Sequence, residues 1–571
     1  MAAPTLEELL ELYSRNELAA AMARRFSLQD GDDVAEAIVR CAQLHNSGQL
    51  DLLRLVEDGT LQALPGPSFF MAMHFFCKVL PELKATPARV MAVVDALVQH
   101  GGDDLAANQP NAAFREWCSK DPSRSHEVIA ASDAGDPMAM RHLTFALEGA
   151  GDVTGARRIA LMFEGERALS AVTALGRIVD LDLASVTETI ETLAQVLDRD
   201  GTDLVRSNVL YAFMSVLSRD AALWGPLSTA LLERLLEGAG ELTLHQGARV
   251  LWAHPKALRP EIVVAITAAL RGVNPANRGT IEELDLGVRA LLETGYEEEA
   301  LQLVTHLASS NQGLELSAFS SFMQTLVDGA PERLSMAAAR WLRGGDRNLC
   351  DGLAEAMRQL GRDEVELTLR AEDIGDDPSL QIFICRKAIG YFFLQPRLAA
   401  SVLVSVLRHC RDDVAEKIQD LLMDCLLVNY GGVRAYLERI GADDPAKPRV
   451  DAALAGNDAY LAALRAIPEI KELRPSEHDR RIERIRRHDA MAAAHKEAQK
   501  NSVLLSLIKR SVILYGNRTL SFIADGHKAL KPIETDLNRL EVSFEMPRML
   551  FVDPIGLDFK LRVFRNERIA E

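Results

Sequence analysis

The densest cluster of basic side chains in this sequence is a run of arginines between residues 480 and 487. Arginine binds phosphate through paired hydrogen bonds, so the run has the chemistry of a nucleic-acid or polyanion site. However, Glu483 and Arg487 have the spacing of an ion pair on a helix, and no aromatic residue lies nearby to stack on bases. Two interpretations stay open, a polyanion site and a solvated or protein-docking helix, for Arg480, Arg481, Arg484, Arg486 and Arg487.

Two His-Asp pairs in the same region could supply metal ligands. They are His478-Asp479 and His488-Asp489, and His495 follows two helical turns after His488. A metal centre needs further ligands from other helices, and His488 and His495 are about 10 Å apart along one helix. The pattern therefore predicts a solvated helix face and no metal site.

Other motifs with known chemistry are absent or have a simpler explanation. The sequence contains neither a GxxxxGK[ST] phosphate loop nor a GxSxG nucleophile motif. The glycines between Gly149 and Gly155 follow a helical pattern and lack the spacing of a dinucleotide-binding turn, so they predict a loop between helices. His74 lies in an apolar run, FFMAMHFF, that is typical of a packed core. We predict no catalytic residue and no cofactor.

Composition indicates a chain that folds without disulfides in a reducing compartment. The 571 residues are 48% hydrophobic, too many for one ordinary core, so the chain divides into domains or stacks repeats. The N-terminal sequence has no secretory signal and no apolar stretch is long enough to span a membrane, so we expect a cytoplasmic protein. The excess of arginine over lysine suggests a bacterial origin. Seven scattered cysteines predict buried thiols: Cys41, Cys77, Cys118, Cys350, Cys385, Cys410 and Cys425.

Charge is unevenly distributed along the chain. From Lys471 onward there are 20 Lys+Arg and 15 Asp+Glu, which leaves 44 and 67 before it. The first part therefore carries −23 and the last part +5, which together give the total of −18. An acidic first part disfavours non-specific binding to nucleic acid or to an anionic membrane.

Helix signals recur throughout the first 470 residues. Thr86-Pro87, Asp136-Pro137 and Asp377-Pro378 each place a capping residue before a proline at the first helical position. Glycines at short intervals then limit the helices to roughly 10 to 18 residues. We expect essentially no β-structure in this part of the chain. Capping boxes are predicted at Thr5 with Glu8, Ser185 with Glu188, and Thr280 with Glu283.

This succession of short helices resembles the α-solenoids. GDVTGARRIALMF from Gly151 and GYEEEALQLVTHL from Gly295 are similar to tetratricopeptide-like repeat starts, whereas LRPEIVVAITAAL from Leu258 is similar to a HEAT repeat. The resemblance extends to the broad helical-repeat class and to no specific family. It implies helical hairpins that bury their apolar faces against neighbouring hairpins.

A change of character after residue 470 predicts two further parts. A charged helix is expected from Ser476 to Arg510, followed by a hairpin around Gly516-Asn517. Asp553 to Gly556 has the residue order of a type I turn. Alternating apolar residues predict additional antiparallel strands at Leu540, Val542, Phe544 and Met546, and at Leu557, Phe559, Leu561 and Val563.

The sequence therefore predicts a mainly α protein with three parts: an α-solenoid of stacked helical hairpins in residues 1–470, a basic charged helix in 471–510 and a small antiparallel β module in 511–571. The favoured function is a non-enzymatic scaffold or adaptor that binds another protein in a bacterial multi-protein complex. One alternative is a regulatory subunit of an anti-phage defence system that contacts nucleic acid through the arginine-rich helix. Another is an enzyme whose site is assembled from distant residues. The sequence predicts neither the identity of this protein partner nor the oligomeric state.

Overall fold

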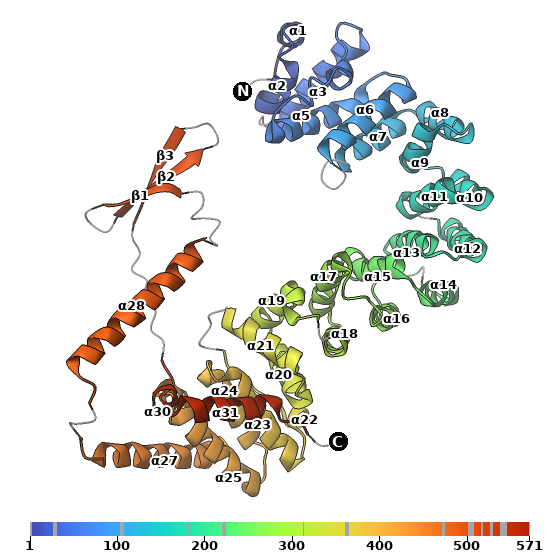
Figure 1. Ribbon diagram of the computed structural model, residues 1–571. Helices are drawn as coiled ribbons and strands as arrows, with labels where there is room; N and C mark the ends of the chain where they lie inside the picture. Colours follow the sequence, from blue (N-terminus) through green and yellow to red (C-terminus); the bar gives the residue numbers. More distant parts are fainter. Residues whose placement is uncertain are drawn as a thin grey trace. The chain divides into compact units, whose positions relative to one another are not determined.

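The structure, a computed structural model, divides into two units (Figure 1). Unit 1 comprises residues 1–337 and 346–360, and unit 2 comprises 338–345 and 361–571. The structure describes residues 3–26, 31–102, 108–179, 182–219, 224–311, 313–359, 365–470, 474–500, 508–514, 518–525, 529–536 and 545–569.

The regular secondary structure of unit 1 is all helical over its described residues. Its elements are α1 (Leu6–Ser14), α2 (Leu18–Ala21), η1 (Met22–Phe26), α3 (Gly31–Asn46), α4 (Arg54–Glu57), α5 (Gly66–Val79), η2 (Leu80–Glu82), α6 (Pro87–Gly101), α7 (Asn108–Lys120), α8 (Pro122–Asp133), α9 (Pro137–Ala150), α10 (Val153–Met162), α11 (Gly165–Arg177), α12 (Leu183–Arg199), α13 (Asp203–Leu217), α14 (Pro226–Leu236), α15 (Glu241–Ala253), η4 (Pro255–Ala257), α16 (Pro260–Leu270), α17 (Arg278–Thr294), α18 (Glu297–Ser310), η5 (Leu316–Phe319), α19 (Ser320–Asp328) and α21 (Arg347–Gln359).

Unit 2 contains helices and one sheet. Helix α20 (Pro331–Gly344) starts in unit 1 and ends in unit 2. The remaining elements are α22 (Ala371–Ile374), α23 (Pro378–Phe392), α24 (Pro396–Leu407), α25 (Asp412–Leu421), η6 (Leu422–Leu427), α26 (Gly432–Glu438), α27 (Lys447–Ala466), α28 (Glu477–Lys500), β1 (Ile508–Leu514), β2 (Arg518–Asp525), β3 (Ala529–Asp536), α30 (Met549–Val552) and α31 (Pro554–Asn566).

Most predicted helix starts are confirmed, with two corrections. Asp136 and Asp377 cap α9 and α23 ahead of a proline, and Thr5 forms its capping box with Glu8. The boxes predicted at Ser185 and Thr280 are wrong. Those residues lie three positions inside α12 and α17, where their N–H groups donate to the true caps, Asp182 and Asn277.

Two layers of helices form the main part of unit 1, as expected for an α-solenoid. The odd-numbered helices from α7 to α19 each contact the next, and the even-numbered helices from α10 to α18 do the same on the other side (Figure 1). Successive odd-numbered helices approach each other closely. A Cβ placed on Gly176 of α11 would lie 2.7 Å from the Cα of Ala212 on α13, so only glycine permits this distance.

Apolar side chains fill the space between the layers. The predicted core role of the FFMAMHFF run is confirmed for Met73, Phe75 and Phe76, which are buried, and is wrong for Phe70 and His74, which are exposed. The glycines from Gly149 to Gly155 lie at the junction of α9 and α10, and Gly151 ends α9 in a left-handed conformation. All seven cysteines are free thiols, and only Cys410 is partly exposed.

The last helix of the chain packs on α23 inside unit 2. Leu557 and Phe564 of α31 are buried. The Arg565 Nε donates to the Gly390 carbonyl at 2.6 Å, while the buried Lys387 Nζ donates to the Arg565 carbonyl at 2.5 Å. Gly390 has no Cβ, which leaves room for the backbone of α31 at this contact.

The segment before α31 is attached to the same body. The Glu545 carboxylate accepts from the Gly431 and Gly432 N–H groups at 2.5 and 2.9 Å at the start of α26. The Met549 N–H donates to the Asn429 Oδ1 at 2.9 Å. Residues 545–569 thus form a continuous C-terminal segment that is anchored at both ends, and we call it the C-terminal strap.

A three-stranded antiparallel sheet confirms the predicted β module. Its strand order is β1-β2-β3, with Leu514 paired to Arg518 and Phe522 paired to Pro532. The residues of the predicted Gly516-Asn517 turn lie outside the described residues. The charged helix is shorter than predicted, because α28 ends at Lys500 and Lys509 and Arg510 belong to β1.

The strand predicted at Leu557 to Val563 is wrong, because this segment is helix α31. Asp553 is the cap of α31 and Pro554 its first residue, so the predicted type I turn is a helix start. The strand predicted at Leu540 to Phe544 lies outside the described residues, and Met546 is in neither helix nor strand. Strand β3 has no counterpart among the strands predicted from the sequence.

Within the described residues before 470 there is no strand, as expected. In the part of the chain that the structure describes, no helix is both long and apolar enough to cross a bilayer.

The Gly176 contact gives a first testable prediction. Gly176→Ala should lower the free energy of unfolding by about 1 to 3 kcal/mol, because the new methyl group overpacks against the α13 backbone. Gly279→Ala is the control, since a Cβ there meets nothing closer than 3.8 Å, and it should leave stability unchanged or raise it by up to about 1 kcal/mol. Denaturant unfolding measures both, and equal effects would contradict the close packing of α11 on α13.

Candidate docking surfaces

The five arginines predicted as a polyanion or partner site lie on α28, and all are exposed. Arg487 Nε donates to the Glu483 Oε1 at 3.1 Å, so this i,i+4 ion pair forms. Arg484 Nε lies 3.4 Å from the Arg480 carbonyl. With these local contacts, α28 remains a solvated helix. Its side chains are compatible with a polyanion and with a protein as the ligand.

The two His-Asp pairs are also on α28, and their side chains are exposed. Asp479 Oδ2 accepts from the Ser476 Oγ at 2.6 Å, which stabilises the first turn of the helix. Among the described residues, no three His, Cys, Asp or Glu side chains gather closely enough to hold a metal ion.

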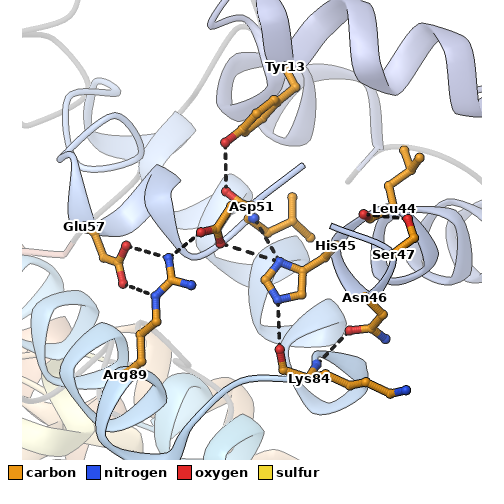
Figure 2. A network of polar contacts seen from close by, with 10 residues as sticks. Tyr13, Leu44, His45, Asn46, Ser47, Asp51, Glu57, Lys84 and Arg89 are labelled. Atoms are coloured by element: carbon orange, nitrogen blue, oxygen red, sulfur yellow. Dashed lines mark hydrogen bonds and ion pairs between the residues drawn. The ribbon is translucent and has the colours of Figure 1, made fainter. Parts of the chain in front are cut away.

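A polar network near the N-terminus contains a His-Asp arrangement that sequence reasoning missed (Figure 2). His45 Nδ1 accepts from the Leu52 N–H at 3.2 Å, and its Nε2 lies 3.3 Å from the Lys84 carbonyl. The neutral ring satisfies both contacts, with a proton on Nε2. Burial lowers the pKa of His45, which favours that neutral form. Asp51 is 3.6 Å from Nδ1, too far for a hydrogen bond.

The rest of this network joins segments that are distant in sequence. Arg89 of α6 donates to the Asp51 carboxylate at 2.6 Å and to the Glu57 carboxylate through two further hydrogen bonds (Figure 2). These bonds to carboxylates raise the pKa of Arg89. Because both nitrogens of His45 are engaged with the backbone, the cluster stabilises the start of unit 1 and offers no free base for catalysis.

A second histidine, His142 on α9, is buried against the ring of Phe114. Its Nε2 lies 2.9 Å from the Asp95 Oδ1 of α6. Burial lowers the pKa of His142 more than the nearby carboxylate raises it. The folded structure therefore contains His142 in its neutral form.

A series of polar and aromatic contacts in unit 1 crosses five consecutive odd-numbered helices, from α7 to the end of α15. Glu148 of α9 accepts from Arg115 of α7 at 2.8 Å and lies 4.0 Å from Arg177 of α11. Arg177 Nε donates to the Tyr211 hydroxyl of α13 at 3.2 Å. The Tyr211 ring then meets His254, which follows α15, edge to face at 6.5 Å. We call Arg115, Glu148, Arg177, Tyr211 and His254 the arginine–aromatic ladder.

Arg177 is the centre of the ladder. Its guanidinium lies 5.7 Å from the centroid of the Phe145 ring and 5.9 Å from that of Tyr211, within the range of cation–π attraction. The side chain remains 35% exposed, so it is held in place yet accessible to a partner. Burial lowers the pKa of His254, and Arg249 lowers it further. The ladder thus combines a fixed cation with half-exposed aromatic rings.

In unit 2, a cavity of about 400 Å³ lies between α23, η6, α27 and the C-terminal strap. Ile389, Phe393, Met423 and Leu561 contribute apolar lining, and Asp424, Tyr460 and Lys560 contribute polar groups. Nothing in the sequence pattern predicts it, because its walls come from segments more than 150 residues apart.

Acidification tests the role of the buried histidines. The pKa of each buried histidine is lower in the folded chain than in the unfolded chain, so the unfolded chain binds more protons. The free energy of unfolding is therefore at its full value above about pH 6.5 and falls as the pH decreases below it. His142→Gln should reduce this pH dependence by up to about 1.4 kcal/mol per pH unit between pH 6.5 and 5. The measurement is chemical unfolding across that range. The exposed His74→Gln variant is the control, and equal slopes for wild type and His142→Gln would refute the prediction.

For the arginine-rich helix we expect no nucleic-acid binding. The chain has a net charge of −18, and the charge of the helix is screened beyond about 10 Å at 0.1 M salt. Wild type and an Arg480→Ala, Arg484→Ala, Arg487→Ala triple variant should therefore behave alike with duplex DNA or RNA near roughly 100 mM salt, as measured by fluorescence anisotropy.

A variant with three other exposed arginines replaced, Arg158, Arg249 and Arg347 of unit 1, is the matched control for the triple variant of α28. Sub-micromolar, salt-sensitive binding that only the α28 variant abolishes would contradict this expectation and establish the helix as a polyanion site.

No family model matches the sequence, and no curated protein matches it. Solved structures give distant matches. One is from a study of Kap95p bound to RanGDP, with 13% identity, a TM-score of 0.29, and coverage of 80% of this chain and 65% of that chain. An engineered protein has 15% identity and a TM-score of 0.18, with 77% and 98% covered. A circular tandem repeat protein has 13% identity and a TM-score of 0.18, with 81% and 98% covered. The α-solenoid assignment rests on the helix packing described above.

Proposed function

We propose that this chain is a non-enzymatic scaffold that binds another protein through the arginine–aromatic ladder of unit 1. The observation that carries the proposal is the position of Arg177 between the Phe145 and Tyr211 rings, with its Nε bonded to the Tyr211 hydroxyl. Arginine and tyrosine are the residue types that most often dominate binding energy at protein interfaces. A side chain that is already ordered loses little further entropy on binding.

The two-layer architecture supports the same function. Each odd helix exposes one part of the ladder, so a partner that lies along these helices contacts several repeats at once. Arg115 and Arg177 offer donors to carboxylates, and the half-buried Tyr211 and Trp252 offer apolar surface. We infer a folded or extended protein partner that presents acidic and apolar side chains.

The setting that we propose is the bacterial cytoplasm, where the chain serves as the adaptor subunit of a multi-protein complex. Free, mostly buried thiols and the excess of arginine over lysine support this setting. A second candidate function, contact with nucleic acid in a defence system, is favoured by one observation, the five exposed arginines of α28. The salt-dependence experiment above tests it.

Co-purification tests the scaffold. Tagged wild-type chain, an Arg177→Ala, Tyr211→Ala variant and an Arg158→Ala variant are each incubated with nuclease-treated extract of the source organism. The ladder variant should recover at least tenfold less of the bound protein, because two central contacts worth about 2 kcal/mol or more each are removed.

Arg158 is an exposed arginine of α10, in the even layer, and its replacement should leave recovery unchanged. Circular dichroism establishes that each variant is folded. Equal recovery by the ladder variant and wild type would exclude the ladder as the docking surface, and equal loss in the Arg158→Ala variant would show that the effect is not specific to this face.

A further inference from the structure

The outer side of the C-terminal strap carries an apolar stripe that the described residues of unit 2 leave uncovered. Ile555, Phe559 and Val563 follow one another at intervals of four along α31 and therefore share one side of the helix. Helix α30, directly before the Asp553 cap, adds three more apolar side chains. The three side chains of this outer stripe and their three neighbours on α30 are 41 to 82% exposed: Leu550, Phe551, Val552, Ile555, Phe559 and Val563.

Helix α31 cannot hide this stripe by rotating. Its opposite side is fixed on α23 by the buried Leu557 and Phe564 and by the two main-chain contacts of Arg565. Arg386 Nη1 also bonds the Glu567 carboxylate at 2.7 Å. The stripe is therefore a permanent feature of the folded surface.

The three side chains that share one side of α31 form a patch of the size that is often functional. At about 150 to 250 Å² for a fully exposed large apolar side chain, their exposures of 82, 69 and 46% leave roughly 300 to 500 Å² accessible. The largest uncovered apolar patch on a monomeric protein is typically about 300 to 600 Å² and is often a binding surface. The exposed apolar side chains of α30 add to this apolar surface next to the stripe.

The charges beside the stripe identify the occupant. Asp558 and Arg562 lie on the same flank, four residues apart, where they form an exposed 2.8 Å ion pair. In an antiparallel pair of α31 helices centred near residues 559 and 560, Asp558 of one copy lies opposite Arg562 of the other, and Ile555 lies near Val563. In a parallel two-fold pair these flanks would lie on opposite sides of the contact, so the charges of the two copies would not meet. The surface is therefore self-complementary in one orientation only.

We propose that the outer stripe of the C-terminal strap is a two-fold interface with a second copy of this chain. The two α31 helices pack antiparallel, Phe559 lies at the centre, and two symmetric Asp558–Arg562 pairs flank it. This surface belongs to unit 2, so the proposal is independent of the ladder in unit 1.

Sedimentation velocity of the full chain tests the interface between about 0.1 and 50 µM. Wild type should dimerise in this range. Phe559→Asp should be monomeric throughout, since it places a charge at the apolar centre. Asp558→Arg and Arg562→Asp should each weaken dimerisation at least tenfold, because each opposes like charges across the axis. The double exchange should restore the wild-type dissociation constant to within about threefold.

All these side chains are exposed, so thermal unfolding of each variant at low concentration should match wild type and exclude a folding defect. A wild type that stays monomeric over the whole range would overturn the proposal. Dimerisation insensitive to Phe559→Asp would place the interface elsewhere, and failure of the double exchange to restore it would exclude the antiparallel pairing. Monomer that binds phosphatidylglycerol vesicles through Phe559 would identify the stripe as a membrane surface instead.

Discussion

Packing of each helix against its counterpart about one repeat away is the interaction on which the rest of the structure depends. Side-chain bonds between repeats join residues 33, 34 and 40 positions apart in Arg115–Glu148, Arg177–Tyr211 and Asp203–Thr243. Asp203 of α13 even caps α15, because its carboxylate accepts from the Gly240, Leu242 and Thr243 N–H groups. A helix start in one repeat is thus completed by its neighbour. Stability in such an array is largely a sum over neighbouring contacts, which explains how a long chain folds without a single central core.

Local signals predicted the helices well because caps act within four residues. Asp136 and Asp377 are followed directly by a proline, so the cap and the first helical residue are adjacent in sequence. The boxes at Ser185 and Thr280 were misplaced because Asp182 and Asn277, three residues earlier, are equally good caps and start the helix first. Helix α31 was mistaken for a strand because it is apolar on two sides, with Leu557 and Leu561 inward and Phe559 and Val563 outward. Two apolar sides on a helix reproduce an alternating pattern.

Surfaces that combine residues from several repeats could not be predicted from the sequence, for a different reason. The arginines of α28 are contiguous, so their clustering is visible in the sequence. The members of the arginine–aromatic ladder are separated by 29 to 43 residues, and these intervals vary because loop lengths differ between repeats. No fixed period therefore reveals Arg177 beside Tyr211. The cavity in unit 2 could not be predicted from the sequence for a similar reason, because the strap that covers it comes from the end of the chain.

The C-terminal strap shows how one helix can serve two surfaces. Its inner side covers α23 and gives the buried ammonium of Lys387 a carbonyl partner, Arg565, which that charge needs inside a protein. Its outer side remains apolar although solvent exposure of such residues favours aggregation and gives no stability to the monomer. The inner contacts alone do not require apolar residues at positions 555, 559 and 563. The proposed outer contact accounts for their apolar identity, and Asp558 and Arg562 fix the orientation in which a second copy can supply it.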